Sequence, residues 1–251
     1  MIIKLNHENK TYSADLSKPI DLSIEIKNGD NNPSCYWAED VEFSTIYAGD
    51  FVGSVKEGGT VNYQTLKMTP HGNGTHTETF GHLTSDENAT ISLLHKNFHS
   101  IAELITLNTE LSSEGDHIVS YSDFLVKRKL NTSAVIIRTL PNDSSKLKKN
   151  YSGTNPPFLD SRITQKLNEE KVQHLLIDLP SVDKEVDGGA LLAHRAFWGL
   201  PNQIRKECSI TELIYVPENV TDGLYLMNLQ TLNINMDASP SRPIIFKLDI
   251  C

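Results

Sequence analysis

The chain has 251 residues, of which 38% are hydrophobic and 22% charged; this is ordinary globular usage and excludes disordered and collagen-like classes. The formal net charge of −9 argues against a basic surface for nucleic acid or for an anionic membrane, so we expect neither partner. The sequence contains no run of 18 consecutive apolar residues, so we expect no membrane-spanning helix.

The length fits one large domain, and we expect a single domain over residues 1–251. The three cysteines, Cys35, Cys208 and Cys251, are scattered and lack the spacing of a disulfide framework. The first residues turn polar too early to form the apolar core of a signal peptide. Together these features predict a reducing, cytoplasmic location.

Short apolar and β-branched runs predict the strands of the protein. They fall at residues 20–26, 134–140, 174–179, 212–215 and 242–248. The run at 134–140 is apolar at successive positions, which is typical of a strand buried on both faces. We therefore expect it at the centre of a sheet.

A helix is predicted over residues 160–171. Leu159, Ile163 and Leu167 recur at four-residue steps, and Asp160 or the following serine can cap the first turn. A helix followed by a buried strand is typical of the α/β class.

Residues 141–157 are polar and contain Lys146, Lys148 and Lys149. This composition predicts a solvated loop, and a lid or an anion contact is the functional alternative.

Histidines gather in the segment from His71 to His82. Three of the nine histidines of the chain fall in these twelve residues, together with Glu78. Neutral imidazole and carboxylate groups both donate to divalent ions such as Zn²⁺ and Mn²⁺. His76 and Glu78 are two residues apart, so on a strand they point to the same side. The spacing favours a metal site; a polar glycine turn with surface histidines is the alternative.

The same segment resembles the signature of the metal-dependent cyclase family, which includes bacterial kynurenine formamidases and isatin hydrolase. That signature reads His-x-Gly-Thr-His-x-Asp-x-Pro-x-His. Gly74, Thr75, His76 and His82 match it, and an acid stands two residues after His76. Further segments resemble family landmarks in the same chain order, so the resemblance covers residues 20–248. These are residues 21–23, 134–139, 177–183, 194–195, 212–213 and 237–243.

The chain departs from the signature at three positions. Glu78 stands where the family has aspartate, and Phe80 stands where it has proline. Gly72 occupies the position of the first histidine, so His71 can serve only if the turn accommodates one extra residue; Asn73 is the alternative. These changes indicate a divergent member.

The resemblance implies an α/β fold of the swivelling β/β/α type with a β-barrel-like core. It also implies one or two divalent ions, Zn²⁺ or Mn²⁺. The ligands that it implies are His71, His76, Glu78, His194 and Glu212. Of these, the first three would form one site, and the last two would hold a second ion or complete the shell.

The implied activity is hydrolysis of a small amide, most simply an aryl formamide such as N-formylkynurenine in tryptophan catabolism. His82 would be the acid–base group. Trp37 and Phe80 would line the pocket for an aryl substrate, with core packing as the alternative. Ring opening or dehydration of another small molecule, and a metal-binding protein without catalysis, stay open as other functions. The family also suggests a homodimer or a larger homo-oligomer.

Overall fold

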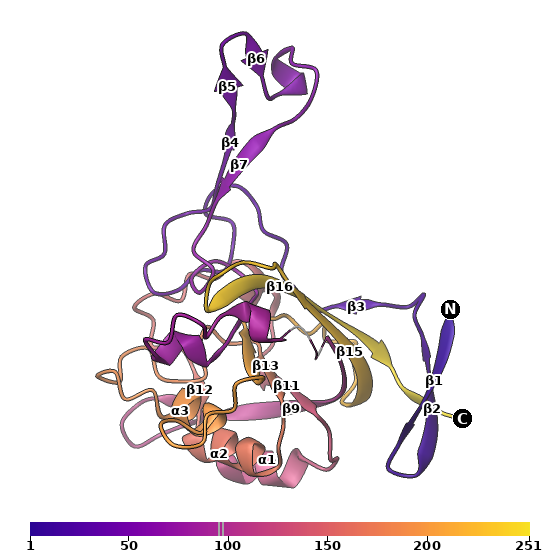
Figure 1. The fold of residues 1–251 in the computed structure, drawn as a ribbon. Coiled ribbons are helices and arrows are strands. Elements are labelled where there is room, and N and C mark those ends of the chain that lie inside the picture. The colour runs from indigo at the N-terminus through magenta and orange to yellow at the C-terminus, as the bar shows by residue number, and fades with distance from the viewer. Residues whose placement is uncertain (95, 97) are drawn as a thin grey trace.

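The computed structural model describes residues 1–94, 96 and 98–251, and their arrangement is shown in Figure 1. Seven strands form a closed ring, because neighbouring strands pair in order and the seventh strand also pairs with the first. In ring order they are β11 (Ala134–Leu140), β13 (His174–Ile177), β14 (Ser209–Glu212), β8 (His76–Glu78), β16 (Ala238–Lys247), β15 (Gly223–Thr231) and β9 (His99–Leu111). The α/β class and the barrel-like core are confirmed.

Strand β11 lies in the centre of the parallel part of the barrel, paired with β9 on one side and β13 on the other. Its residues alternate between two apolar clusters. Val135 and Ile137 pack with the helices outside, whereas Ala134 and Ile136 pack with other strands inside the barrel. The predicted central position is confirmed.

Three helices accompany the barrel within the described residues: α1 (Tyr121–Lys127), α2 (Ser161–Glu169) and α3 (Leu192–Trp198). Helix α2 confirms the predicted helix, although it ends two residues earlier than expected. The Asp160 side chain caps it by accepting a hydrogen bond from the Arg162 amide. Ile163 and Leu167 are fully buried against the barrel. No helix among these is long and apolar enough to cross a membrane.

Two predicted strands differ most from the observed ones; those predicted at 174–179 and 242–248 are β13 and β16 with shifted ends. The first, predicted at 20–26, is only β3 (Ile20–Asp21), because the Asp21 side chain accepts hydrogen bonds from Ser23 and turns the chain. The other, predicted at 212–215, is β14, which ends at Glu212. Leu213 has a φ of +53°, so the chain leaves the sheet there.

The remaining strands lie outside the ring. A small sheet joins both ends of the chain, and two short strands extend the barrel sheet beyond β9. An arm of paired strands projects from the body at the top of Figure 1. The small sheet contains β1 (Ile2–His7), β2 (Lys10–Asp15) and β17 (Asp249–Ile250); the extension contains β10 (His117–Val119) and β12 (Phe158–Leu159); the arm contains β4 (Glu42–Thr45), β5 (Tyr47–Ala48), β6 (Phe51–Val52) and β7 (Gln64–Lys67).

The polar segment 141–157 is less solvated than expected. It contains a short 3-10 helix, η4 (Ser144–Leu147), in which Lys146 is buried. The Lys146 ammonium donates to the Thr139 carbonyl at 2.8 Å and pairs with Asp178 at 2.8 Å. The lysine therefore fastens the loop to the strand ends, and it is not exposed as a lid or anion contact would require.

Candidate metal centre

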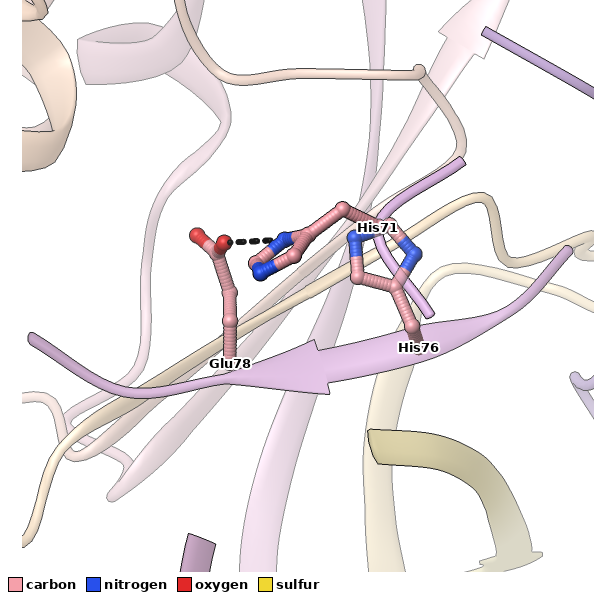
Figure 2. A group of neighbouring side chains, drawn as sticks. All are labelled: His71, His76 and Glu78. Atoms are coloured by element: carbon pink, nitrogen blue, oxygen red, sulfur yellow. Dashed lines mark ion pairs between the residues drawn. The ribbon is translucent and has the colours of Figure 1, made fainter. Parts of the chain in front are cut away.

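Strand β8 places the centre of the histidine segment in the wall of the barrel. It lies between β14 and β16, and His76 sits directly opposite Glu212 of β14. Figure 2 shows His76 and Glu78 on the same side of β8, as their two-residue spacing predicts. Both are buried, with at most 1% of their surface exposed.

His71 reaches this group from the turn that precedes β8. Its Nδ1 lies 3.2 Å from Glu78 Oε2, and its Nε2 lies 2.7 Å from Asp237 Oδ2 (Figure 2 shows the first pair). Gly74, with a φ of +75°, lets the turn close where a Cβ would collide with Ile26. Asn73 is used inside the turn, because it bonds the Thr69 amide and the Glu39 carbonyl.

His194 enters from helix α3. Its Nδ1 lies 2.7 Å from Asp183 Oδ2. The same carboxylate accepts hydrogen bonds from the backbone amides of Ala193 and His194 at the start of the helix. Its Nε2 therefore faces the cluster, 3.0 Å from Glu78 Oε1 and 3.7 Å from Glu212 Oε1. A carboxylate behind an imidazole is the usual arrangement that orients a metal-binding histidine.

His76 and Glu212 are held in a similar way. His76 Nδ1 lies 3.1 Å from the Gly74 carbonyl, and its Nε2 lies 3.4 Å from Glu212 Oε2. The other oxygen of Glu212 accepts a hydrogen bond from the Val182 amide at 2.9 Å. Backbone groups thus direct the free ends of both side chains toward the cluster.

His82 lies at the open side, in the 3-10 helix η2 (Phe80–Leu83). Its Nδ1 is 3.5 Å from Asp237 Oδ2 and 3.9 Å from Glu78 Oε2, and a third of its side chain is exposed. The ring centres of His71 and His82 are 4.3 Å apart. His82 is therefore the histidine of this group that solvent reaches most easily.

Several polar atoms of the cluster lack partners although they are buried. Among side chains in the described ranges, His76 Nε2, His194 Nε2 and both carboxylate oxygens of Glu78 have no hydrogen bond of acceptable geometry. His194 Nε2 and Glu78 Oε1 are only 3.0 Å apart, yet they are misaligned for a mutual bond. Leaving such groups unsatisfied is costly, so each demands an explanation. Side chains that converge on a shared cation have this arrangement.

The donor atoms also suit a divalent ion. Potential ligand atoms of His71, His76 and Glu78 lie within 4.8 Å of one another, and so do those of Glu78, His82 and His194. Glu78 belongs to both groups. Imidazole nitrogens with carboxylate oxygens are ligands of Zn²⁺ and also suit Mn²⁺, so the residues fit a metal centre of one or two ions.

The charges of the cluster depend strongly on one another. Burial favours the neutral form of His71, but the carboxylates of Asp237 and Glu78 outweigh it and raise its pKa to about 10. Burial likewise opposes the charge on His194, yet Glu78 and Asp183 raise its pKa well above the ordinary value. Burial would raise the pKa of Glu78, but His194 and His71 hold it well below its usual range. The carboxylates thus favour positive charge at this position.

A cavity of about 260 Å³ opens onto the cluster. Its wall contains five cluster residues and six others, which are His71, Glu78, His82, His194, Glu212, Tyr36, Ser181, Lys184, Glu185, Asp187 and Leu191.

The predicted aromatic residues lie elsewhere. Trp37 is 70% exposed and lies outside the cavity wall, whereas Phe80 is 1% exposed and packs in the core. The aromatic side chain in the wall is Tyr36, and burial of its hydroxyl raises its pKa.

Sequence reasoning did not select Asp183, Asp237 or Tyr36. The two aspartates lie in segments that resemble family landmarks, at 177–183 and 237–243, and that was the available signal. Tyr36 had no signal except its place beside Trp37. Asp183 and Asp237 act through histidines that are distant in sequence, which a local pattern cannot show.

Comparison with solved structures shows the same fold in other proteins. A predicted metal-dependent hydrolase from Bacillus stearothermophilus superposes with a TM-score of 0.65 at 17% identity, over 91% of this chain and 98% of that chain. Isatin hydrolase A from Ralstonia solanacearum superposes with a TM-score of 0.64 at 13% identity, over 91% of each chain. At these identities the likeness concerns the fold.

Comparison with curated protein sequences finds no match. A family model described as "Putative cyclase" matches residues 15–184, which is more than half of the chain and includes the whole segment from His71 to His82. The barrel, the histidine segment and this match agree, and the chain belongs to the cyclase family.

Proposed function

We propose that the protein is a metal-dependent hydrolase of a small amide. The observation that carries the proposal is the set of buried atoms without a hydrogen bond on His76, Glu78 and His194. Glu78 and His194 line the cavity. Such atoms are expected where a bound cation completes a site. The fold shared with metal-dependent hydrolases supports the same function.

The residues that would hold one or two ions, Zn²⁺ or Mn²⁺, are His71, His76, Glu78, His194 and Glu212. A divalent ion there would polarise a carbonyl group and lower the pKa of water. Asp183 would keep the His194 ring in place, and Glu212 is fixed by the Val182 amide.

His82 is the proposed acid–base group. It lies at the open side of the cluster beside Asp237 and lines the cavity. An imidazole in this position can take a proton from water and return it to the departing nitrogen of an amide. Asp237 would keep the ring oriented during both transfers.

An aryl formamide such as N-formylkynurenine is the substrate that we propose within this class. The cavity is small, and the Tyr36 and Leu191 side chains give it an aromatic and an apolar surface. Hydrolytic opening of a cyclic amide is the second candidate. It is favoured by the shared fold with isatin hydrolase.

The test is turnover by protein reconstituted with Zn²⁺ or Mn²⁺, on a panel of N-formyl aromatic amines and of cyclic amides that includes isatin. We expect metal-dependent hydrolysis of at least one class, abolished by a chelator and restored by the ion. Metal binding without turnover of either class would instead favour a metal-binding protein that lacks catalysis.

We also propose a homodimer. Apolar side chains of the projecting arm support this, because Tyr47, Val55, Tyr63 and Leu66 are each more than half exposed. Light scattering after size-exclusion chromatography measures the mass directly, and a monomer of 28.0 kDa at all concentrations would contradict the proposal.

A further inference from the structure

The wall of the cavity contains a lysine whose charge is already neutralised. Lys184 is the one lysine or arginine among the residues that line the cavity. Its ammonium pairs with Asp116 Oδ2 at 2.7 Å, and Asp116 Oδ1 accepts from the Asn155 side chain at 3.0 Å. The partners of this lysine therefore lie within the protein.

Two carboxylates in the same wall are held by backbone amides and have no positively charged partner among the described residues. Glu185 accepts hydrogen bonds from the amides of Gly153 and Asn155 at 2.7 and 3.3 Å. Asp187 accepts hydrogen bonds from the amides of Gly189 and Leu191 at 2.8 and 2.7 Å.

Neither Glu185 nor Asp187 forms an ion pair with any residue that the structure describes. Backbone amides thus fix both groups in place, and each oxygen keeps a second lone pair for a ligand.

The charges differ between the buried and the half-buried residues of the cavity wall. An ion held by the metal cluster would be matched by Glu78 and Glu212, which line the cavity and are buried. The half-buried part of the wall, which contains Glu185 and Asp187, then stays negative, and a low-dielectric cleft strengthens its field. A carboxylate on a substrate would meet Glu185 and Asp187 there, whereas a protonated amine would find two acceptors.

We propose that the site takes amides whose far end is a protonated amine and discriminates against amides whose far end is a carboxylate. This inference rests on the proposed hydrolytic function for its substrate class. The cavity is more than an acidic patch, because Glu78, 1% exposed, directs unpartnered oxygens into it. Tyr36 and Leu191 fit the apolar body of such a molecule.

The proposal separates two closely related compounds. N-formylkynurenine contains both an amine and a carboxylate, and its decarboxylated counterpart, N-formylkynuramine, retains the amine and the aryl formamide. We expect the decarboxylated compound to be the better substrate, since it places no anion beside Glu185 and Asp187.

A matched kinetic series tests the charge alone. Formanilides with a para-aminomethyl, para-hydroxymethyl or para-carboxymethyl group share one scissile amide, and the methylene insulates it from the substituent. For the metal-loaded protein we expect kcat/KM to fall in that order, by at least about tenfold from cation to anion. Glu185→Gln and Asp187→Asn should each reduce this ratio, and Glu169→Gln, on the exposed side of α2, should leave it unchanged.

Binding of the same three compounds to metal-free protein gives a second readout without turnover. Calorimetry should place the amine first and the carboxylate last. If the amine binds best but no compound is hydrolysed, the charge preference stands and the hydrolytic function fails. If the compounds are hydrolysed equally, or the carboxylate is preferred, the inference is overturned while hydrolysis stands. An unchanged ratio in both carboxylate variants also overturns it.

Discussion

Two buried charged groups near the ends of barrel strands are satisfied to very different degrees. The Lys146 ammonium contacts Asp178, the Thr139 carbonyl and the Thr139 hydroxyl, all within 3.0 Å, and Asp178 also accepts the Thr139 amide. In the cluster around Glu78, four buried atoms on three side chains have no hydrogen-bond partner among the described residues. Both groups are buried and charged. The two groups differ in how many of their polar atoms are hydrogen-bonded. A buried network that leaves atoms without hydrogen bonds is the better sign of a ligand site.

The largest effect is expected from removing a central side chain of the incomplete group. His76→Ala deletes a nitrogen that faces the cluster, so the protein should lose most of its metal and with it its activity. Elemental analysis after dialysis measures this, with the exposed His117→Ala as control. Wild-type metal content in His76→Ala would refute the metal assignment.

His82→Ala separates proton transfer from metal binding. We expect the metal to be retained and turnover to fall by about 10² to 10⁴, because a general acid–base group contributes that much. Activity and metal content are measured on the same sample. Unchanged turnover removes His82 from the mechanism, and loss of metal makes it a ligand.

Lys146→Met breaks the complete group and should act on stability alone. It leaves Asp178 buried without its cation, which costs about 3–5 kcal/mol in comparable cases. Burial already raises the pKa of Asp178, although Lys146 opposes this, and the substitution should raise it further. A carboxyl group whose pKa is raised in the folded state contributes stability at low pH, and this contribution is lost as the pH rises. The deficit in the free energy of unfolding of Lys146→Met should therefore grow from acidic to neutral pH.

Chemical denaturation at two pH values tests this, with the exposed Lys148→Met as the matched control. A deficit that does not change with pH, or a loss of metal in Lys146→Met, would contradict the proposed difference between the two groups.

Asp183→Asn tests the support behind His194. The amide no longer offers a second carboxylate oxygen to the imidazole, so we expect metal affinity to weaken by about 10- to 100-fold with the fold retained. Competition with a chelator gives the affinity. Wild-type affinity would mean that Asp183 only caps helix α3.

Glu78→Asp recreates the family signature and has the smallest expected effect. Glutamate is longer by about one carbon–carbon bond, and the turn at His71 carries an extra residue, so the shorter acid should weaken metal binding or activity. Glu78→Gln should impair both through loss of charge. If both variants match the wild type, Glu78 is no ligand and the non-catalytic alternative gains support.

Much of the fold was predictable from local patterns, and the remainder depends on distant contacts. Apolar periodicity identified α2 and β11, and two-residue spacing put His76 and Glu78 on one face. The pairing of β9 with β11, which closes the barrel, joins segments that no local pattern connects.

The same limit applies to the site. His194 and Glu212 came from the family resemblance, because each reaches the cluster from a separate element. Lys146 looked like a solvated lysine, since its acidic partner Asp178 lies 32 residues away in the chain. Tyr36 lines the cavity, while the larger neighbour Trp37 points to solvent.

Anomalous diffraction from crystals of the protein with its native metal tests the central claim most directly. We expect a peak bonded to a Glu78 oxygen and to His76 Nε2 or His194 Nε2, at the roughly 2.0–2.2 Å of zinc–nitrogen and zinc–carboxylate bonds. A peak elsewhere would contradict it. So would density in which these same atoms rotate to satisfy one another by hydrogen bonds, as Lys146 and Asp178 do.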